Sequence, residues 1–145
     1  MSQSITPVSH HDVEIVLKCY ELRREAVMRQ SRDALFFKFS PQSYEDFIAV
    51  TKPDHPLNAA FRQVSSYWEM VYAFVKHGAV NGEHFMEGNS EGLLLYAKIL
   101  PFLARLREEL SPLAFRNAEW VATNTELGKL RLELFKVRVA QMAEL

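Results

Sequence analysis

Apolar residues recur at intervals of three and four positions through almost every long segment of this chain. Between residues 57 and 77 they include Phe61, Val64, Trp68 and Val75, which share one broad side of a helix. No segment shows the two-residue alternation of a half-buried strand. Residues 34–39 could be extended, but no other segment offers them a partner strand. Only five glycines and six prolines occur in 145 residues, which favours few turns. The sequence therefore predicts an all-α bundle of five to seven helices.

The length of 145 residues suits one domain, and a composition of 48% hydrophobic and 24% charged residues is typical of a folded globular protein. We expect residues 1–8 to form a flexible tail and residues 9–145 a single helical domain. Residues 52–56, which hold two prolines, and residues 78–92, which hold four of the five glycines, are expected to be irregular. The latter segment is expected to contain one short turn around residues 84–86.

Several helix boundaries follow from residue type. A first helix is expected from residue 10 to about residue 35, and Pro101 is expected to kink or restart its helix because it lacks an N–H. Ser111 and Pro112 are expected to start a helix that runs to about Asn124. A short helix is expected to start at Ser40 and Pro41 or at Ser43. The remaining expected boundary residues are Ser90 and Thr125 as N-terminal caps and Gly78 as a left-handed C-terminal cap.

The charge balance and the cysteine count argue against several classes of protein. Lysine and arginine number 17 against 18 acidic residues, whereas nucleic-acid binders usually carry a basic surplus. Cys19 is the only cysteine, which excludes an intramolecular disulfide and fits a reducing compartment. The most apolar run, residues 93–106, contains Lys98 and Arg105 and is shorter than the ~20 residues of a membrane span. With no signal-peptide pattern at residues 1–9, we expect a cytoplasmic protein.

No reactive grouping can be recognised in the sequence. The five histidines include no pair at i and i+4 and no Glu-x-x-His, so neither a zinc nor a di-iron motif is present. The oxygen-rich segment 81–91 lacks the spacing of a calcium loop, because His84 stands where a bidentate glutamate is needed. Nucleophile-elbow, phosphate-loop and dinucleotide motifs do not occur. We assign no catalytic residue, metal or cofactor, and an enzyme is the weakest of the function classes.

The last expected helix, residues 126–145, carries two apolar stripes. The centres of the stripes lie about 140° apart around the helix at ~100° per residue. One stripe is enough to dock the helix on its own core, so the other must be covered elsewhere in the chain or by a second copy. Both possibilities remain open, and the second predicts a homodimer. The stripes are Leu127, Leu130, Leu134 and Val137, and Leu132, Phe135, Val139, Met142 and Leu145.

Charged residues also fall on otherwise small or apolar helix faces. A buried charge costs several kcal/mol unless it is paired, so we expect Glu69 or Glu119 to pair with Arg131 or Arg138. The same side chains could instead line a pocket for a small molecule or anion. The candidate residues for this buried polar cluster or pocket are Arg62, Trp68, Glu69, Arg116, Glu119, Trp120, Arg131 and Arg138.

Two stretches resemble a known family. They run from Phe61 through Trp68 and Glu69 to Val80, and from Ser111 to Trp120. Together they are similar to a family of bacterial all-helical proteins classed as a domain of unknown function, and the likeness covers about residues 61–124. The resemblance implies a helical fold and a bacterial origin, and it supplies no reaction or catalytic residues. Some similar proteins carry an N-terminal membrane helix, for which this sequence shows no pattern.

Two functions are therefore carried forward. The first is a helical protein that acts by self-association or protein–protein interaction, as a homodimer in the cytoplasm. The alternative is a regulatory domain that binds a small molecule or anion in a pocket between helices, lined by arginine and tryptophan.

Overall fold

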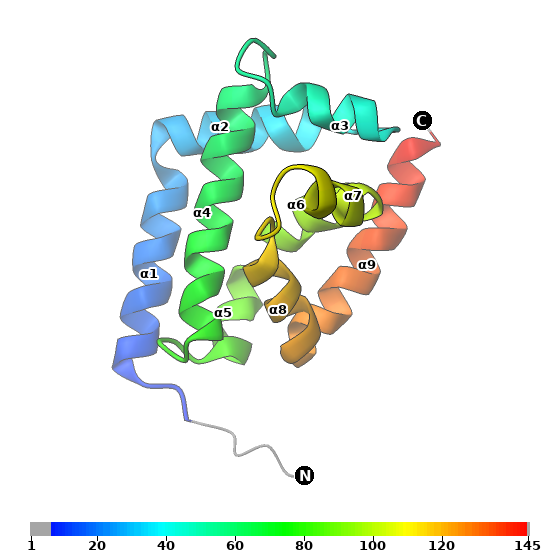
Figure 1. The fold of residues 1–145 in the computed structure, drawn as a ribbon. Coiled ribbons are helices and arrows are strands. Elements are labelled where there is room, and N and C mark those ends of the chain that lie inside the picture. Colours follow the sequence, from blue (N-terminus) through cyan, green and yellow to red (C-terminus); the bar gives the residue numbers. More distant parts are fainter. Residues whose placement is uncertain (1–6, 145) are drawn as a thin grey trace.

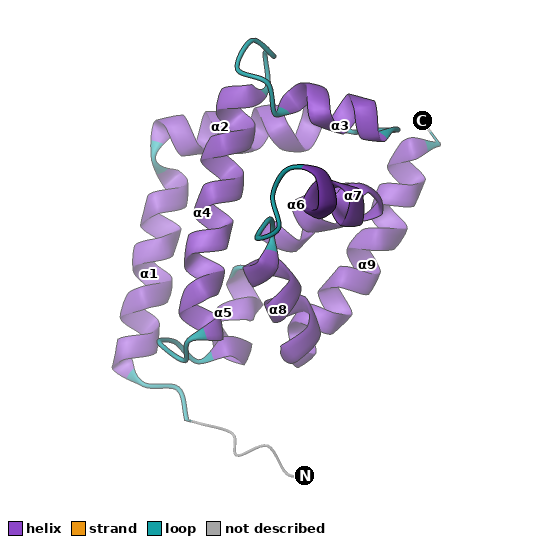
Figure 2. Ribbon diagram, in the orientation of Figure 1, coloured by secondary structure: helices purple, strands orange, loops and turns teal. Residues whose placement is uncertain are grey.

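The computed structural model describes residues 7–144 and confirms the all-α class, since these residues contain helices and no strand (Figure 2). Most of the expected tail lies outside the described residues. The expected count of five to seven helices is too low, because breaks divide the chain into nine α-helices within the described part. They are α1 (His10–Arg24), α2 (Ala26–Lys38), α3 (Tyr44–Val50), α4 (Asn58–Lys76), α5 (Gly82–Gly88), α6 (Gly92–Ile99), α7 (Leu103–Glu109), α8 (Arg116–Asn124) and α9 (Glu126–Ala143), with the 3-10 helix η1 (Leu100–Phe102) before α7.

Helix α4 lies at the centre of the packing (Figure 1). It packs against α2 on one side and α8 on another, while α9 packs against α6 and α8. Helix α1 lies alongside α4, and the Tyr67 hydroxyl of α4 donates to the carbonyl of Cys19 in α1 at 2.9 Å. The described chain begins beside α1 and ends with α9 at the opposite edge of the bundle.

The expected helix 10–35 is broken at Glu25. That residue has an extended ψ of 141°, and its carboxylate accepts hydrogen bonds from the N–H groups of Val27 and Met28, both at 3.0 Å. A capping carboxylate thus begins a second helix, and α2 turns away from α1 to cross α4. The helical spacing of apolar residues continues from α1 into α2, so the sequence pattern does not indicate the bend at Glu25.

Three other boundary predictions are wrong. The segment 82–88 is the helix α5 rather than a single turn, and the Ser90 hydroxyl donates back to the Met86 carbonyl instead of capping α6. Helix α8 begins at Arg116 and not at Ser111, because Phe115 adopts a left-handed φ of 58°. The Phe115 ring is buried against Phe61, so core packing holds a conformation that sequence rules disfavour.

The remaining boundary predictions are confirmed. Of the two expected starts of α3, the structure uses Ser43 and not Ser40. Ser43 caps α3 and Thr125 caps α9 through their side chains, and Gly78 has a positive φ of 74°. Pro101 lies in η1, where the chain restarts before α7.

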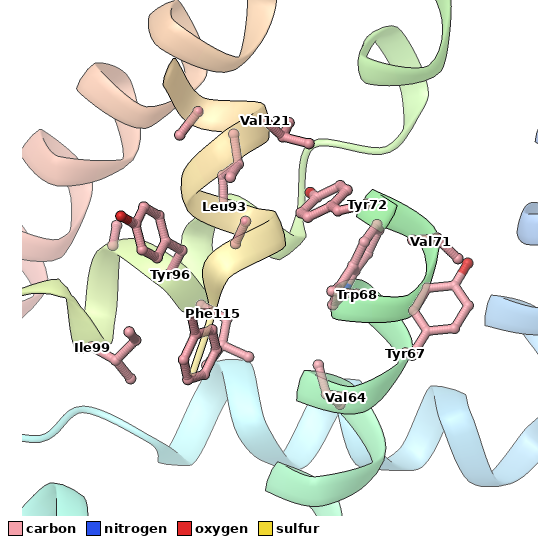
Figure 3. Packing of buried hydrophobic residues seen from close by; sticks show 14 of the residues in the cluster. Val64, Tyr67, Trp68, Val71, Tyr72, Leu93, Tyr96, Ile99, Phe115 and Val121 are labelled. Atoms are coloured by element: carbon pink, nitrogen blue, oxygen red, sulfur yellow. The ribbon is translucent and has the colours of Figure 1, made fainter. Parts of the chain in front are cut away.

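The core is aromatic and surrounds α4 (Figure 3). Trp68 and Tyr72 are almost fully buried, with ring centroids 5.4 Å apart. Gly92 allows α6 to approach them closely, because a Cβ at that position would lie 2.7 Å from the Trp68 ring. The Tyr72 hydroxyl reaches the Asn89 carbonyl at 2.9 Å, which fastens the α5–α6 segment to the core.

Candidate functional site

Glu69, expected in an ion pair, instead caps a helix. Its carboxylate accepts hydrogen bonds from the N–H groups of Asn117 at 3.1 Å and Ala118 at 2.8 Å, in the first turn of α8. Burial raises the pKa of Glu69 above its ordinary value, while these two N–H groups oppose the rise. Since the first N–H groups of a helix have no partner within it, Glu69 fastens α8 to α4.

Glu119 pairs across helices, but with a residue not singled out in the sequence. Its carboxylate lies 2.7 Å from Arg107 of α7 and 3.6 Å from Arg116 of its own helix. Within residues 7–144, Arg131 and Arg138 of α9 form no ion pair with a carboxylate. The Arg138 guanidinium lies 5.3 Å from the centroid of the Phe135 ring. The expected pairing of Glu69 or Glu119 with α9 is therefore wrong.

The two tryptophans and the predicted arginines do not meet at one place. Arg62 and Glu69 line an open hollow of about 420 Å³ with Phe115. The Arg62 guanidinium donates to the Asn58 side chain at 3.1 Å. Trp68 is 2% exposed in the core, and Trp120 lines a different hollow near the start of α1.

A polar cluster missed in the sequence joins the α1–α2 bend to the segment before α6. The Glu91 carboxylate accepts two hydrogen bonds from Arg32, at 3.1 and 2.5 Å, and lies 3.9 Å from Arg23. Arg23 also donates to the Gly88 carbonyl at 3.2 Å. These residues are separated by up to 68 positions in the chain, so no local pattern could have indicated the cluster. Its contacts are those of a structural clamp.

Lys98 of α6 is a buried cation at the end of α2. It is 3% exposed, and its ammonium donates to the carbonyls of Phe36 at 3.1 Å and Phe39 at 2.7 Å. Burial lowers the pKa of Lys98 to about 8. The side chain also borders an apolar hollow of about 540 Å³ between η1 and the last turns of α9. Its hydrogen bonds identify Lys98 as a C-terminal cap of α2.

Helix α9 packs one of its two apolar stripes, and Leu127 at the start of the other, against the core of its own chain. Phe135 is buried, and Leu132 and Val139 pack against the core from the same side of the helix. On the other side, Leu130, Leu134 and Val137 are 56%, 53% and 58% exposed. We call these three residues the outward stripe. Helix α9 lies at the edge of the bundle (Figure 1), and the exposure of these three residues places the outward stripe on its solvent side.

Charged residues border the outward stripe on both flanks. At ~100° per residue, Glu126 and Glu133 fall on one flank and Arg131 and Arg138 on the other. Both glutamates are exposed and pair within their own helix, with Lys129 at 3.2 Å and Lys136 at 3.1 Å, respectively. An exposed apolar stripe with charged borders has the anatomy of a small protein interface.

The sequence pattern of one protein family matches residues 8–125, more than half of the chain, and the family is described as a domain of unknown function, DUF4760. The chain belongs to the DUF4760 family. No curated protein and no solved structure matches it. The DUF4760 match ends at Thr125, the cap of α9, so the outward stripe lies beyond the matched span.

Residues 7–144 of this DUF4760 protein lack two features that would indicate a specific function. No helix in that part is long and apolar enough to cross a membrane. No group of three or more histidine, cysteine or acidic side chains there could hold a metal ion.

Proposed function

We propose that this bacterial DUF4760 protein is a cytoplasmic association protein whose residues 9–145 form a single helical domain and pair as a homodimer. The observation that carries the proposal is the outward stripe, Leu130, Leu134 and Val137, each more than half exposed on one face of α9. A single exposed leucine is ordinary on a protein surface, but three aligned along one helix face are typical of an interaction site.

A second copy is the partner that this surface suits best. Around a two-fold axis the same patch serves both subunits, so a stripe along a straight helix can cover itself. The inner side of α9 is already occupied by α6 and α8, which leaves the outward side available. Removal of three leucine-sized side chains from water in each copy supplies the driving force.

The alternative, an anion-binding pocket, has less support. Trp68 packs within the core, and the Glu69 carboxylate is engaged by the N–H groups of α8. Arg62 shares an open hollow with Glu69. The negative charge of Glu69 offsets the positive charge of Arg62, so the hollow does not favour the binding of an anion.

The test is the mass in solution of the wild type and of Leu134→Glu, by sedimentation equilibrium at concentrations up to about 0.5 mM. We expect a dimer for the wild type and a monomer for the variant, because a charge in the middle of the stripe cannot be buried without a partner. Leu113→Glu is the matched control, since Leu113 is 78% exposed and lies outside α9. A monomeric wild type, or a Leu134→Glu variant that still dimerises, contradicts the proposal.

A further inference from the structure

The charges beside the outward stripe are sorted by sign. Glu126 and Glu133 border one side of the stripe, and Arg131 and Arg138 border the other. We propose that the two α9 helices of the dimer lie parallel, so that both glutamates of each copy face both arginines of the other. This inference rests on the proposed function and adds the orientation of the two chains.

The spacing along α9 is that of a coiled-coil seam. Leu127, Leu130, Leu134 and Val137 follow one another at intervals of three, four and three residues, as the a and d positions of a heptad do. Leu127 packs partly against the core of its own chain, so the exposed part of the seam is the outward stripe, Leu130, Leu134 and Val137. In this register Glu126 and Glu133 occupy g positions, and Arg131 and Arg138 occupy e positions. The e and g positions form the ion pairs that set partner choice and orientation in coiled coils.

Only one orientation brings opposite charges together. In a parallel pair each g residue faces the e residue five positions further along the other helix, so Glu126 meets Arg131 and Glu133 meets Arg138. In an antiparallel pair the g residues face each other and so do the e residues. That arrangement would place glutamate beside glutamate and arginine beside arginine, which is repulsive.

The flanking charges are free to make these contacts. Within residues 7–144 neither Arg131 nor Arg138 has an ion pair. The side chains of Glu126 and Glu133 are 72% and 71% exposed, and their pairs with Lys129 and Lys136 span three residues on the surface. Such exposed pairs contribute little, so the carboxylates can change partner at small cost.

The orientation can be tested by disulfide cross-linking of two variants, Leu130→Cys and Val137→Cys. Both positions are more than half exposed, so the fold should tolerate the changes. The natural cysteine, Cys19, is buried, and the wild type is the control which shows that Cys19 forms no cross-link. Positions seven residues apart on a helix are ~10.5 Å apart, whereas the Cα atoms of a disulfide lie about 4.4–6.8 Å apart. We expect each variant to cross-link with itself and the mixture of the two to give no mixed disulfide.

The possible outcomes separate this inference from the proposed function. An antiparallel pair places each a position opposite a d position, so a third variant, Leu134→Cys, reports it. A mixed disulfide of Leu134→Cys with Leu130→Cys or with Val137→Cys, without self-cross-linking at any of the three positions, would show an antiparallel dimer and overturn only the orientation. A wild type that stays monomeric overturns the proposed function and the orientation together. A protein that is dimeric by mass but gives neither a self-disulfide nor a mixed disulfide among the three variants uses another surface, which also overturns both.

A matched pair of charge variants tests the flanking contacts. Arg131→Gln with Arg138→Gln removes two positive charges from the flank, and Lys129→Gln with Lys136→Gln removes the same charge outside the seam. We expect the arginine variant to dimerise about tenfold more weakly at low salt, with the difference reduced at ~1 M salt. The lysine variant should dimerise as well as the wild type or better, because it releases both glutamates. Equal weakening by the two variants would contradict the predicted contacts.

Discussion

Lys98 shows how one buried side chain can serve two opposing requirements. Its ammonium caps α2 through the carbonyls of Phe36 and Phe39, a role that favours the charged form. The same burial removes water from the ammonium and disfavours that form. Desolvation is the larger effect, and it lowers the pKa of Lys98 to about 8.

The pH dependence of unfolding should reveal this balance. The pKa of Lys98 falls from 10.5 to about 8 on folding, so below pH 8 both states are protonated and the full cost of burying the charge is present. Between pH 8 and 10.5 the Lys98 ammonium loses its proton in the folded protein but keeps it in the unfolded chain. The free energy of unfolding therefore rises with pH over this range, by up to about 3 kcal/mol in total. Chemical denaturation between about pH 7.5 and 9.5 should show a stability gain in the wild type that Lys98→Met lacks. Parallel pH profiles for the two proteins would contradict the assignment.

At the scale of helices, periodicity predicted the long elements and missed the breaks. The spacing of apolar residues predicts one helix over residues 57–77, and α4 spans Asn58–Lys76. The bend at Glu25 depends on a carboxylate that folds back on its own chain, and many glutamates on helices do not do so. The left-handed Phe115 is held by tertiary contacts of its ring, which no local rule contains.

The junction of α8 and α9 depends on Gly128, inside the first turns of α9. A Cβ at this position would lie 2.3 Å from the Val121 carbonyl oxygen and 2.4 Å from the Thr125 hydroxyl oxygen. Glycine to alanine within a helix ordinarily stabilises by roughly 0.5–1 kcal/mol. Here the contact with backbone reverses the sign, and we expect Gly128→Ala to lower the free energy of unfolding by about 1–3 kcal/mol.

Gly88→Ala is the matched control for this prediction. A Cβ at Gly88, the last residue of α5, meets no atom within 4 Å. We expect this variant to unfold at the same denaturant concentration as the wild type or slightly higher. If neither alanine variant changed the free energy of unfolding, the prediction that the packing of α9 against α8 leaves no room for a Cβ at residue 128 would be contradicted.

At the scale of the whole molecule, the sequence could indicate the candidate surface but not its direction. Both stripes of α9 are visible as periodic apolar residues, and only the positions of α6 and α8 decide that Phe135 faces inward and Leu134 outward. The partners of charged residues were less predictable still. Glu69 reaches Asn117 across 48 positions, and the pairing depends on how α8 packs on α4.

If the folded chain pairs and the unfolded chain does not, its melting temperature must depend on concentration. By mass action, a hundredfold increase in protein concentration should raise the melting temperature of the wild type by about 3–5 °C. Leu134→Glu should melt at one temperature throughout, because Leu134 is 53% exposed and its replacement removes little from the isolated chain. At the lowest concentrations the two melting curves should therefore converge. If the melting temperatures of the two proteins still differed at the lowest concentrations, Leu134 would stabilise the single chain, and the prediction that it acts through pairing would be contradicted.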